Sequence, residues 1–425
     1  MMDTIFALSS GAPPAGIGIV RLTGPQVPDA LAAVCGRVPE PRRAVRAAFR
    51  DSAGEQIDDG IVLYFPAPHS VTGEDVGELH CHGGRAVVAA LEEALAQIPG
   101  CRRAEPGEFT RRAFANGRID LAEAEGLGDL LSAETEIQRR AAMAMTGGVF
   151  SGAVAQWRER LLALSAEVEA SLDFAEEDEV ETLGDTFAAE LTTFVADLGK
   201  ALAAPHAEML KEGFRVALAG PPNAGKSTLF NALVESEAAI TAEIAGTTRD
   251  VLVQAVAIEG IAFSFVDMAG LRSATDDRIE AIGIERAEAE IAKADVVLWL
   301  GPEGKGPEDS WDIEAQCDRA EHAAKSAPDF VLSARSGEGM EHLRRALVER
   351  ARASMPAPGQ AALNRRQRTL IASARDALVD AATHRDPLLV GECLRRARLS
   401  FDALLGKTST EDVLDAVFGR FCLGK

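Results

Sequence analysis

A short apolar run, residues 214–219, leads directly into a glycine-rich loop, and this junction restricts the folds open to the chain. The loop, Gly220-Pro-Pro-Asn-Ala-Gly-Lys-Ser227, has the pattern G-x-x-x-x-G-K-S. In such a loop the glycines let backbone N–H groups surround phosphates, the lysine reaches the outer phosphates, and the serine hydroxyl ligates Mg²⁺. Leu229, Phe230 and Leu233 follow at helical spacing. A strand, a phosphate-binding loop and a helix are therefore predicted, and residues 213–350 are assigned to the α/β class.

Two further apolar runs, residues 261–266 and 294–300, predict buried strands of the same mostly parallel sheet. Asp267-Met-Ala-Gly270 follows the first run as D-x-x-G, where the aspartate would hold Mg²⁺ through water and the glycine N–H would sense a γ-phosphate. Gly246-Thr-Thr-Arg-Asp250 resembles a first switch, whose threonine would complete the magnesium shell. These motifs stand in the order typical of GTPases.

The guanine-recognition motif N-K-x-D is incomplete. Its best candidate is Ala315-Gln-Cys-Asp318, which keeps only the carboxylate, and Asp309 and Asp312 remain open as alternatives. A Ser-Ala-Arg loop follows another apolar run, where GTPases place a backbone contact to the guanine oxygen. Guanine preference is assigned to Asp318, Ser333, Ala334 and Arg335.

Leu271 stands where other GTPases carry the glutamine that orients the attacking water. Because a leucine side chain forms no hydrogen bond, another group must position the water, and something must replace an arginine finger. Arg249 and Arg272 are candidates for the replacement and equally for structural residues of the switches.

The segments on either side of the α/β unit differ from it in composition and in hydrophobic periodicity. Residues 1–115 mix short β-like runs, such as 17–22 and 61–65, with Gly and Pro, and predict a small α+β domain. Helical periodicity follows, with an apolar stripe over residues 154–168, and it returns over 394–404. Helices on both sides predict that the α/β unit is inserted into one helical domain.

Three connecting segments carry their own signals. Residues 173–181 hold six acids in nine positions and predict a solvated connection. Residues 353–360 predict a linker because of their Pro and Gly content. Thr408-Ser-Thr-Glu411 predicts a capping box before the last helix.

The charge balance, 44 basic against 66 acidic residues and a net charge of −22, disfavours unaided binding to a phosphate backbone. One Tyr and three Trp also argue against a stacking platform for single strands. No apolar run approaches the ~18 residues that a membrane span needs, and the N-terminus lacks the basic start of a signal peptide. Six cysteines without a C-x-x-C pair fit neither a disulfide scaffold nor a zinc module. We therefore expect a reduced, cytoplasmic protein with no membrane partner.

His80-Cys-His82 places two histidines on one face of a predicted strand, where we expect buried packing rather than a metal site. Cys422 is expected to be accessible. The inert thiols are expected to be Cys35, Cys81, Cys101 and Cys393.

With these residues in view, the whole chain resembles the MnmE (TrmE) family of tRNA modification GTPases. The most specific segments lie outside the nucleotide motifs, in Pro106-Gly-Glu-Phe-Thr110 and Phe421-Cys-Leu-Gly-Lys425. The departures from the family pattern are the incomplete guanine motif, Met268 in place of threonine and Leu423 in place of isoleucine. The other matching segments are 3–7, 18–22, 72–78, 82–84, 112–125, 222–227, 246–250 and 280–286.

The resemblance implies a fold of three parts: an N-terminal α+β domain that binds folate and dimerises (1–117), a discontinuous all-α domain (118–212 and 353–425), and an inserted Ras-like P-loop GTPase domain (213–352). It implies a homodimer that acts with the FAD-binding protein MnmG as a heterotetramer and meets tRNA through that complex. The implied reaction adds a carboxymethylaminomethyl or aminomethyl group at carbon 5 of the wobble uridine. The implied cofactors are GTP, Mg²⁺, K⁺ and 5-formyl- or 5,10-methylene-tetrahydrofolate.

The resemblance also assigns roles at the nucleotide. Glu280 matches the glutamate that orients the attacking water through a second water. Ser227 and Thr248 match the magnesium ligands. The potassium ligands correspond to Asn223, Thr247 and the carbonyls of Ala242 and Ile244. The remaining implied GTP contacts are Ala224, Gly225, Lys226, Thr228, Glu243, Ala245, Gly246, Asp267, Met268, Ala269 and Gly270.

For folate, the matching positions are Arg21, Glu78, Arg118 and Lys425. Glu78 would pair with the pterin, and the three bases would receive the glutamate tail. Cys422, three residues from Lys425, would take part in one-carbon transfer, and the alternative is that Phe421 and Cys422 only pack the last helix.

Two other functions stay open at this point. A GTP-dependent switch for ribosome assembly would use the same nucleotide motifs, but it usually carries a basic RNA-binding module. A nucleotide-binding scaffold without turnover is weakened by the intact Lys226, Ser227 and Asp267.

Overall fold

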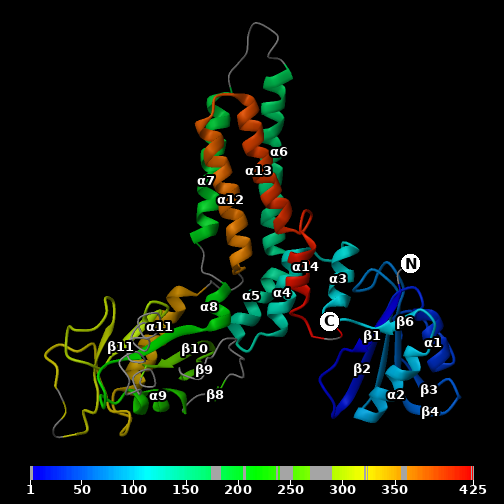
Figure 1. Ribbon diagram of the computed structural model, residues 1–425, viewed down its shortest axis with the longest axis horizontal. Helices are drawn as coiled ribbons and strands as arrows, with labels where there is room; N and C mark the ends of the chain where they lie inside the picture. The colour runs from blue at the N-terminus through cyan, green and yellow to red at the C-terminus, as the bar shows by residue number, and fades with distance from the viewer. Residues whose placement is uncertain are drawn as a thin grey trace, which may run out of the picture. The chain divides into compact units, whose positions relative to one another are not determined.

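The computed structural model of the protein describes residues 3–173, 183–203, 207–235, 238–239, 252–268, 290–319, 322, 324–355, 361–422 and 424. The chain forms two compact units. Unit 1 comprises residues 1–128, 145–166 and 394–425, and unit 2 comprises residues 129–144 and 167–393. Each unit contains one β-sheet and helices (Figure 1).

The sheet of unit 1 has six strands in the order β3-β4-β5-β2-β1-β6. All neighbours pair antiparallel except β1 and β6, which are parallel. Helices α1 and α2 bury Leu31 and Leu91 against Phe6, Leu22 and Leu79 of the strands, which gives the α+β domain predicted for this part of the sequence. The bounds are β1 Thr4–Leu8, β2 Ala15–Thr23, α1 Val27–Cys35, β3 Val45–Arg50, β4 Gln56–Phe65, β5 Val76–Gly83, α2 Arg85–Ala96 and β6 Cys101–Arg103.

The sheet of unit 2 has seven strands in the order β13-β12-β11-β7-β10-β9-β8. Strands β7 and β10 to β13 run parallel, and β8 and β9 form an antiparallel edge. Every residue of β10 is buried, which explains why such strands appear in the sequence as uninterrupted apolar runs. The bounds are β7 Phe214–Ala219, α9 Lys226–Val234, β8 Ala238–Ala239, β9 Leu252–Ile258, β10 Ile261–Asp267, β11 Val296–Trp299, β12 Trp311–Glu314, β13 Phe330–Val331 and α11 Met340–Ser354.

Two long helices of unit 2, α7 (Asp185–Ala203) and α12 (Arg365–Thr383), pack against each other although the seven-stranded sheet lies between them in the sequence. In unit 1, Trp157 packs on Phe150 and Phe401, within the predicted apolar stripe. None of the helices among the described residues is long and apolar enough to cross a membrane. The other helices are α3 Glu108–Ala115, α4 Leu121–Leu131, α5 Glu136–Thr146, α6 Val149–Asp173, α8 Ala207–Glu212, α13 Pro387–Leu404 and α14 Glu411–Phe418.

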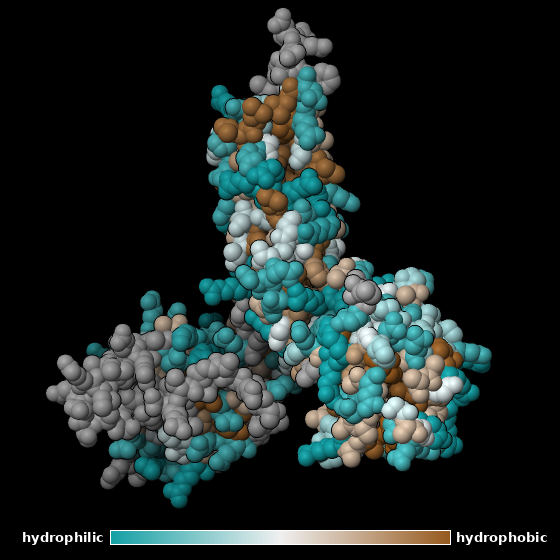
Figure 2. Space-filling view, turned by 45° about the vertical axis from the view of Figure 1, so that its right-hand side comes forward, coloured by the Kyte–Doolittle hydropathy of each residue, from teal (hydrophilic) through white to brown (hydrophobic). Residues whose placement is uncertain are grey.

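Hydrophilic side chains cover most of the face shown in Figure 2, as the content of charged residues predicts. Some apolar side chains are exposed on the long helices. Charged side chains cover the helices because only one stripe of each is needed for packing. The surface is therefore ordinary for a protein of this composition.

Three expectations from the sequence need correction. The capping box at Thr408–Glu411 is absent, because α14 begins at Glu411 and its N-cap is Thr410, whose side chain makes no capping bond. A capping box needs the glutamate three residues inside the helix. The predicted linker at 353–360 starts two residues late, because α11 continues to Ser354, and residues 356–360 lie outside the described residues. Of the acidic run 173–181, the structure describes Asp173 alone.

The third correction concerns the histidines of β5. His82 has 74% of its side chain exposed and pairs with Asp58, and His80 has 26% exposed. The residue buried between them is Cys81. Alternation along the strand places the cysteine, rather than the histidines, on the side of the core.

Candidate functional site

The loop between β7 and α9 has the backbone geometry that its glycines predict. Gly220 has a φ of +144°, and a Cβ there would lie 3.0 Å from the carbonyl carbon of Leu300. Gly225 has a φ of +96° and is the N-cap of α9. Asn223 adopts a φ of +63°, a conformation that asparagine tolerates better than most residues. The loop therefore curls back over the end of β7 and presents backbone N–H groups at the start of α9, which suits an anion.

Lys226 is buried within this loop. Its Nζ donates hydrogen bonds to the carbonyl oxygens of Gly220 (2.9 Å) and Pro221 (2.7 Å). The ammonium group is thus held over the loop, where its charge faces the space that phosphates would occupy.

Ser227 and Asp267 meet at the carboxyl ends of neighbouring strands. The Ser227 Oγ donates to Asp267 Oδ2 at 2.8 Å. Strands β7 and β10 are parallel neighbours, so the loop after one and the last residue of the other lie at the same edge of the sheet. The two oxygens suit Mg²⁺, which prefers hard oxygen ligands. Met268 follows and is buried beside Val253 and Ile291.

A small pocket of about 60 Å³ lies beside this loop. Ser333 Oγ donates to Asp318 Oδ1 at 2.6 Å, and this bond is the main cause that holds the pKa of Asp318 below its usual value. The structure therefore brings the predicted carboxylate and the predicted Ser-Ala-Arg loop together. The pocket lining includes Gly225, Thr228, Asp318, Ser333, Ala334 and Arg335.

The alternatives to Asp318 lie elsewhere. Asp312 is on β12 and pairs with Lys325 at 2.6 Å. Asp309 is exposed in the turn before that strand. Neither lines the pocket.

Gln316 joins the pocket to the phosphate loop, a role that sequence reasoning missed. Its Nε2 donates to the carbonyl oxygen of Asn223 at 3.4 Å, and a Cβ on Gly225 would lie 3.0 Å from the same nitrogen. The one available signal was its place in the incomplete motif, at the position of the lysine of N-K-x-D.

A second group of predicted residues lies in unit 1, on β2 and β5. Arg21 is paired with Glu78 in the register of these strands, and its Nε and Nη2 lie 3.0 and 2.9 Å from Glu78 Oε1. The other oxygen, Oε2, contacts His80 Nε2 at 3.2 Å. Both members of the pair keep about a fifth of their side chains exposed. The Glu78 carboxylate is therefore oriented from both sides and open to a ligand.

The segment near residue 424 lies against the same sheet. Ser9 Oγ donates to the carbonyl oxygen of Gly424 at 2.9 Å. Gly424 has a φ of +86° and approaches the Leu8 carbonyl so closely that a Cβ would clash with it. Leu8 precedes Ser9 at the end of β1, and Ala7 pairs with Arg21.

Arg118 and Cys422 are both exposed. The Arg118 Cγ and Cδ lie beside Gly73, in the segment that leads to β5. Phe421 is buried against Phe418 and Gly128. The alternative role for the last segment, packing of the last helix, is therefore seen for Phe421 and not for Cys422.

Comparison with known proteins decides the family. The model of the MnmE helical domain matches residues 121–422, and the model of the GTP-binding protein TrmE N-terminus matches residues 4–118. Similar proteins include two named tRNA modification GTPase MnmE, one from Erythrobacter litoralis (56% identical over 424 residues) and one from Novosphingobium aromaticivorans (57% over 437 residues). Both alignments cover 100% of each chain. The chain belongs to the MnmE family.

Likeness to solved structures is weaker than this MnmE match. The G domain of the T. maritima FeoB iron transporter is 25% identical and covers 32% of this chain and 98% of its own, with a TM-score of 0.24. Era from Aquifex aeolicus bound to GDP and AlF4⁻ is 21% identical, covers 41% and 69%, and has the same TM-score.

Several residues that the MnmE resemblance assigns lie outside the described residues. They belong to the first switch, to the segment after Met268 and to the last residue of the chain. They are Ala242, Glu243, Ile244, Ala245, Gly246, Thr247, Thr248, Ala269, Gly270, Glu280 and Lys425, together with Arg249, Leu271 and Arg272.

Proposed function

We propose that the chain hydrolyses GTP and that this hydrolysis is coupled to tRNA modification. The observation that carries the proposal is the Ser227–Asp267 contact of 2.8 Å at the carboxyl edge of the sheet, with Lys226 held over the same loop. These two oxygens suit the Mg²⁺ that accompanies a bound nucleoside triphosphate. The tRNA part rests on the full-length relatives, which are named for it.

At the nucleotide, Asp318 takes the guanine ring N–H and amino group, and Ser333 holds its carboxylate in place. Ser227, Asp267 and Thr248 would hold Mg²⁺. A bound Mg²⁺ neutralises charge that develops on the phosphates. Asn223 lies in the phosphate loop and offers the side-chain amide for K⁺, with Thr247 and the carbonyls of Ala242 and Ile244. Glu280 orients the attacking water, because Leu271 forms no hydrogen bond.

In unit 1, Glu78 is the acid for the pterin of a tetrahydrofolate one-carbon donor. Arg21 donates two hydrogen bonds to that carboxylate and orients it. The glutamate tail of the folate is therefore assigned to Arg118 and Lys425. The exposed Cys422 lies two residues from Gly424, which is bonded to Ser9 beside this site, and we assign it to the one-carbon transfer.

The architecture proposed for this activity has the GTPase domain, 213–352, inserted between the helical segments 118–212 and 353–425, after the domain 1–117. The packing of α7 on α12 supports the insertion, because these helices flank the α/β unit in the sequence. We propose a cytoplasmic homodimer that works with the FAD-binding protein MnmG.

A deletion strain tests the function. Its tRNA should lose the carboxymethylaminomethyl or aminomethyl group at the wobble uridine, measured by mass spectrometry of nucleosides. The native chain should restore the group and Ser227→Ala should not, while a surface variant, Arg345→Gln, should. Normal tRNA together with defective ribosomal particles would instead support the assembly switch.

A further inference from the structure

The last residue of β12 is a buried acid. Glu314 has 8% of its side chain exposed, and it ends the strand that leads into the incomplete guanine motif, residues 315–318. Burying a carboxylate costs free energy unless its oxygens are paired with charged or hydrogen-bonding groups. The partners of Glu314 therefore indicate what this side chain does.

Both oxygens of Glu314 contact residues that follow the guanine motif in the sequence. Oε1 lies 3.0 Å from His322 Nε2, and Oε2 accepts the backbone N–H of Lys325 at 2.7 Å. We call residues 315–319, which lie between these positions in the sequence, the recognition segment. The two contacts, named here the Glu314 link, join the residue before this segment to residues after it.

His322 also contacts the recognition segment directly. Its Nδ1 lies 2.9 Å from the carbonyl oxygen of Arg319, while its Nε2 faces Glu314. Both neighbours are acceptors, so the ring that makes both bonds is an imidazolium with a hydrogen on each nitrogen. The bond to the Arg319 carbonyl, and then the bond to Glu314, raise the pKa of His322 above its usual value. The ring therefore connects the end of the recognition segment to the end of β12.

A second acid of β12 holds Lys325. Asp312 and Glu314 are two residues apart on the strand, and side chains at this spacing point to the same face. Lys325 Nζ donates to Asp312 Oδ1 at 2.6 Å and to the carbonyl oxygen of Trp299 at 3.3 Å. Ile313, between the two acids, is buried in the core. Both acids of β12 thus bind residues that follow the recognition segment.

The position of the base-reading acid depends on the Glu314 link. Asp318 is the carboxylate proposed to take the ring N–H and amino group of guanine. Ala315 stands where the asparagine of N-K-x-D supports the ring edge, so the motif lacks that support. Arg319 follows Asp318 directly, and its carbonyl oxygen is bound by His322. The Glu314 link therefore holds the backbone next to Asp318, in a motif that has lost its asparagine.

We propose that Glu314 is a positioning residue for base recognition, because its two bonds hold the recognition segment where Asp318 faces the guanine edge. The described residues that line the base pocket do not include Glu314, so it acts through its partners. The inference rests on the proposed function, in which Asp318 is assigned to guanine. It explains how an incomplete motif still presents its acid.

The test measures the affinity of the full-length chain for GDP and for ADP by competition with a fluorescent GDP analogue. Glu314→Ala should weaken GDP binding about tenfold, because two donors lose their acceptor and Asp318 is no longer held. ADP binding should change less than twofold, since ADP uses the phosphate loop and cannot form the guanine bonds to Asp318. With GTP, KM should rise about tenfold and kcat should stay within twofold, as expected for lost ground-state binding.

Glu314→Gln is the conservative variant. Its amide oxygen can accept the N–H of Lys325, and its NH2 group can donate to Nε2 of a neutral His322 that keeps its hydrogen on Nδ1. Both bonds of the Glu314 link would then persist without the charge. GDP affinity should therefore return to within about threefold of that of the unmodified chain.

A second variant guards against misfolding of Glu314→Ala. His322→Ala removes one of the two bonds at a side chain that is a quarter exposed, and it should weaken GDP binding about threefold without changing ADP binding. The matched control for charge is Glu349→Ala, at an exposed position of α11 outside the base pocket. This control should bind both nucleotides like the unmodified chain.

Three results would overturn the inference. Glu314→Ala and His322→Ala could bind GDP like the control, which would remove the Glu314 link from base recognition. Both variants could lose GDP and ADP affinity equally, which would limit Glu314 to the stability of unit 2. Glu314→Gln could bind GDP as weakly as Glu314→Ala, which would make the charge, and not the two bonds, the cause.

Failure of the guanine assignment is distinguishable from failure of the Glu314 link. If Asp318→Asn leaves the preference among GDP, ADP and XDP unchanged, the assignment of Asp318 is wrong and the inference falls with it. If Asp318→Asn shifts the preference and Glu314→Ala behaves like the control, only the Glu314 link is wrong.

Discussion

Ser333 donates its hydroxyl hydrogen to the Asp318 carboxylate at 2.6 Å, across 15 residues of sequence. Ser333 is fully buried at the end of the β13 segment, so its position is set by the core of unit 2. The hydroxyl fixes the one acid that remains of the guanine motif. The base recognition proposed for Asp318 therefore also depends on Ser333, which holds the carboxylate in place.

The first prediction concerns that pair. Asp318→Asn should shift preference from GDP to XDP, because the amide reverses donor and acceptor at the ring edge, and Ser333→Ala should weaken GDP binding about two- to tenfold through loss of one hydrogen bond. Competition binding with GDP, ADP and XDP measures both. Asp309→Asn is the matched control, since Asp309 is exposed with a φ of +59° that asparagine tolerates. A shift in the control instead would move base recognition to Asp309.

The second prediction concerns the monovalent cation. Turnover of GTP should fall about 10³-fold when KCl is replaced by NaCl at equal ionic strength, because the cation supplies the charge of an arginine finger. Asn223→Gly removes the side chain but fits the φ of +63°, and it should abolish the difference between the salts. Equal turnover of the unmodified chain in both salts would contradict the assignment of Asn223.

The third prediction concerns the water. Glu280→Ala should depress turnover and leave nucleotide binding within a few-fold, because this side chain is assigned to the reaction step and not to the ground state. Titration with a fluorescent GDP analogue and a phosphate-release assay separate the two effects. Loss of binding to the same extent as turnover would give Glu280 a structural role.

The fourth prediction separates Cys422 from its neighbour. Cys422 is exposed, so Cys422→Ser should abolish tRNA modification while GTP hydrolysis and thermal stability stay near normal. Phe421 is 6% exposed, and Phe421→Ala should destabilise unit 1 by about 3 kcal/mol. Nucleoside analysis and thermal unfolding measure the two outcomes. Retained modification in Cys422→Ser would leave the segment a structural role.

The fifth prediction concerns pH. Burial raises the pKa of Glu108, but bonds from Arg102 at 2.8 Å and from Arg112 at 3.1 Å bring the pKa below its usual value. A carboxyl with a lowered pKa in the folded state stabilises it above the unfolded pKa of about 4.3, and the contribution is lost as pH falls through the folded value. The gap in unfolding midpoint between the unmodified chain and Glu108→Gln should shrink from pH 7 to pH 3. A difference in midpoint that stays constant with pH would show that the ion pairs of Glu108 do not contribute to the free energy of unfolding.

The sequence predicts some elements well for a physical reason. Residues 214–219 form β7 with the predicted bounds, and the prediction for β10 is one residue short, because strands buried on both faces need an unbroken apolar run. The two-residue strand β13 and three-residue β6 carry no such signal. Residues 294–300 form a shorter strand, Val296–Trp299, since the Asp295 side chain accepts the backbone N–H of Arg215 before the strand starts.

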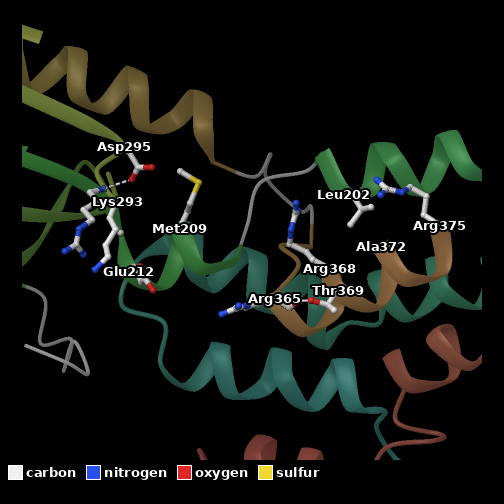
Figure 3. A pocket seen from close by; sticks show the side chains of 12 residues that line it. Leu202, Met209, Glu212, Lys293, Asp295, Arg365, Arg368, Thr369, Ala372 and Arg375 are labelled. Atoms are coloured by element: carbon white, nitrogen blue, oxygen red, sulfur yellow. Dashed lines mark hydrogen bonds between the residues drawn. The ribbon is translucent and has the colours of Figure 1, made fainter. Parts of the chain in front are cut away.

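Local sequence patterns do not predict features that depend on contacts between residues far apart in the chain. The box at Thr408–Glu411 has the right residue types, yet the helix starts two residues later than the box requires. The bridge from Gln316 to Asn223 joins positions 93 residues apart, and no periodicity along the chain indicates it. A pocket of about 740 Å³ likewise joins residues of α12 to residues at the amino ends of β7 and β11, and no local pattern indicates it (Figure 3).

The hydrogen bond between Ser9 and Gly424 spans 415 positions of the chain. At 5–20 residues per second, a ribosome needs about 20 to 80 s to make the chain between them. The N-terminal sheet can form long before Gly424 emerges, so the end of β1 gains this contact only when synthesis has reached Gly424. A chain that stopped short of Gly424 would leave the Ser9 hydroxyl without this acceptor, so a contact at the end of the first strand depends on a residue that is synthesised 415 positions later.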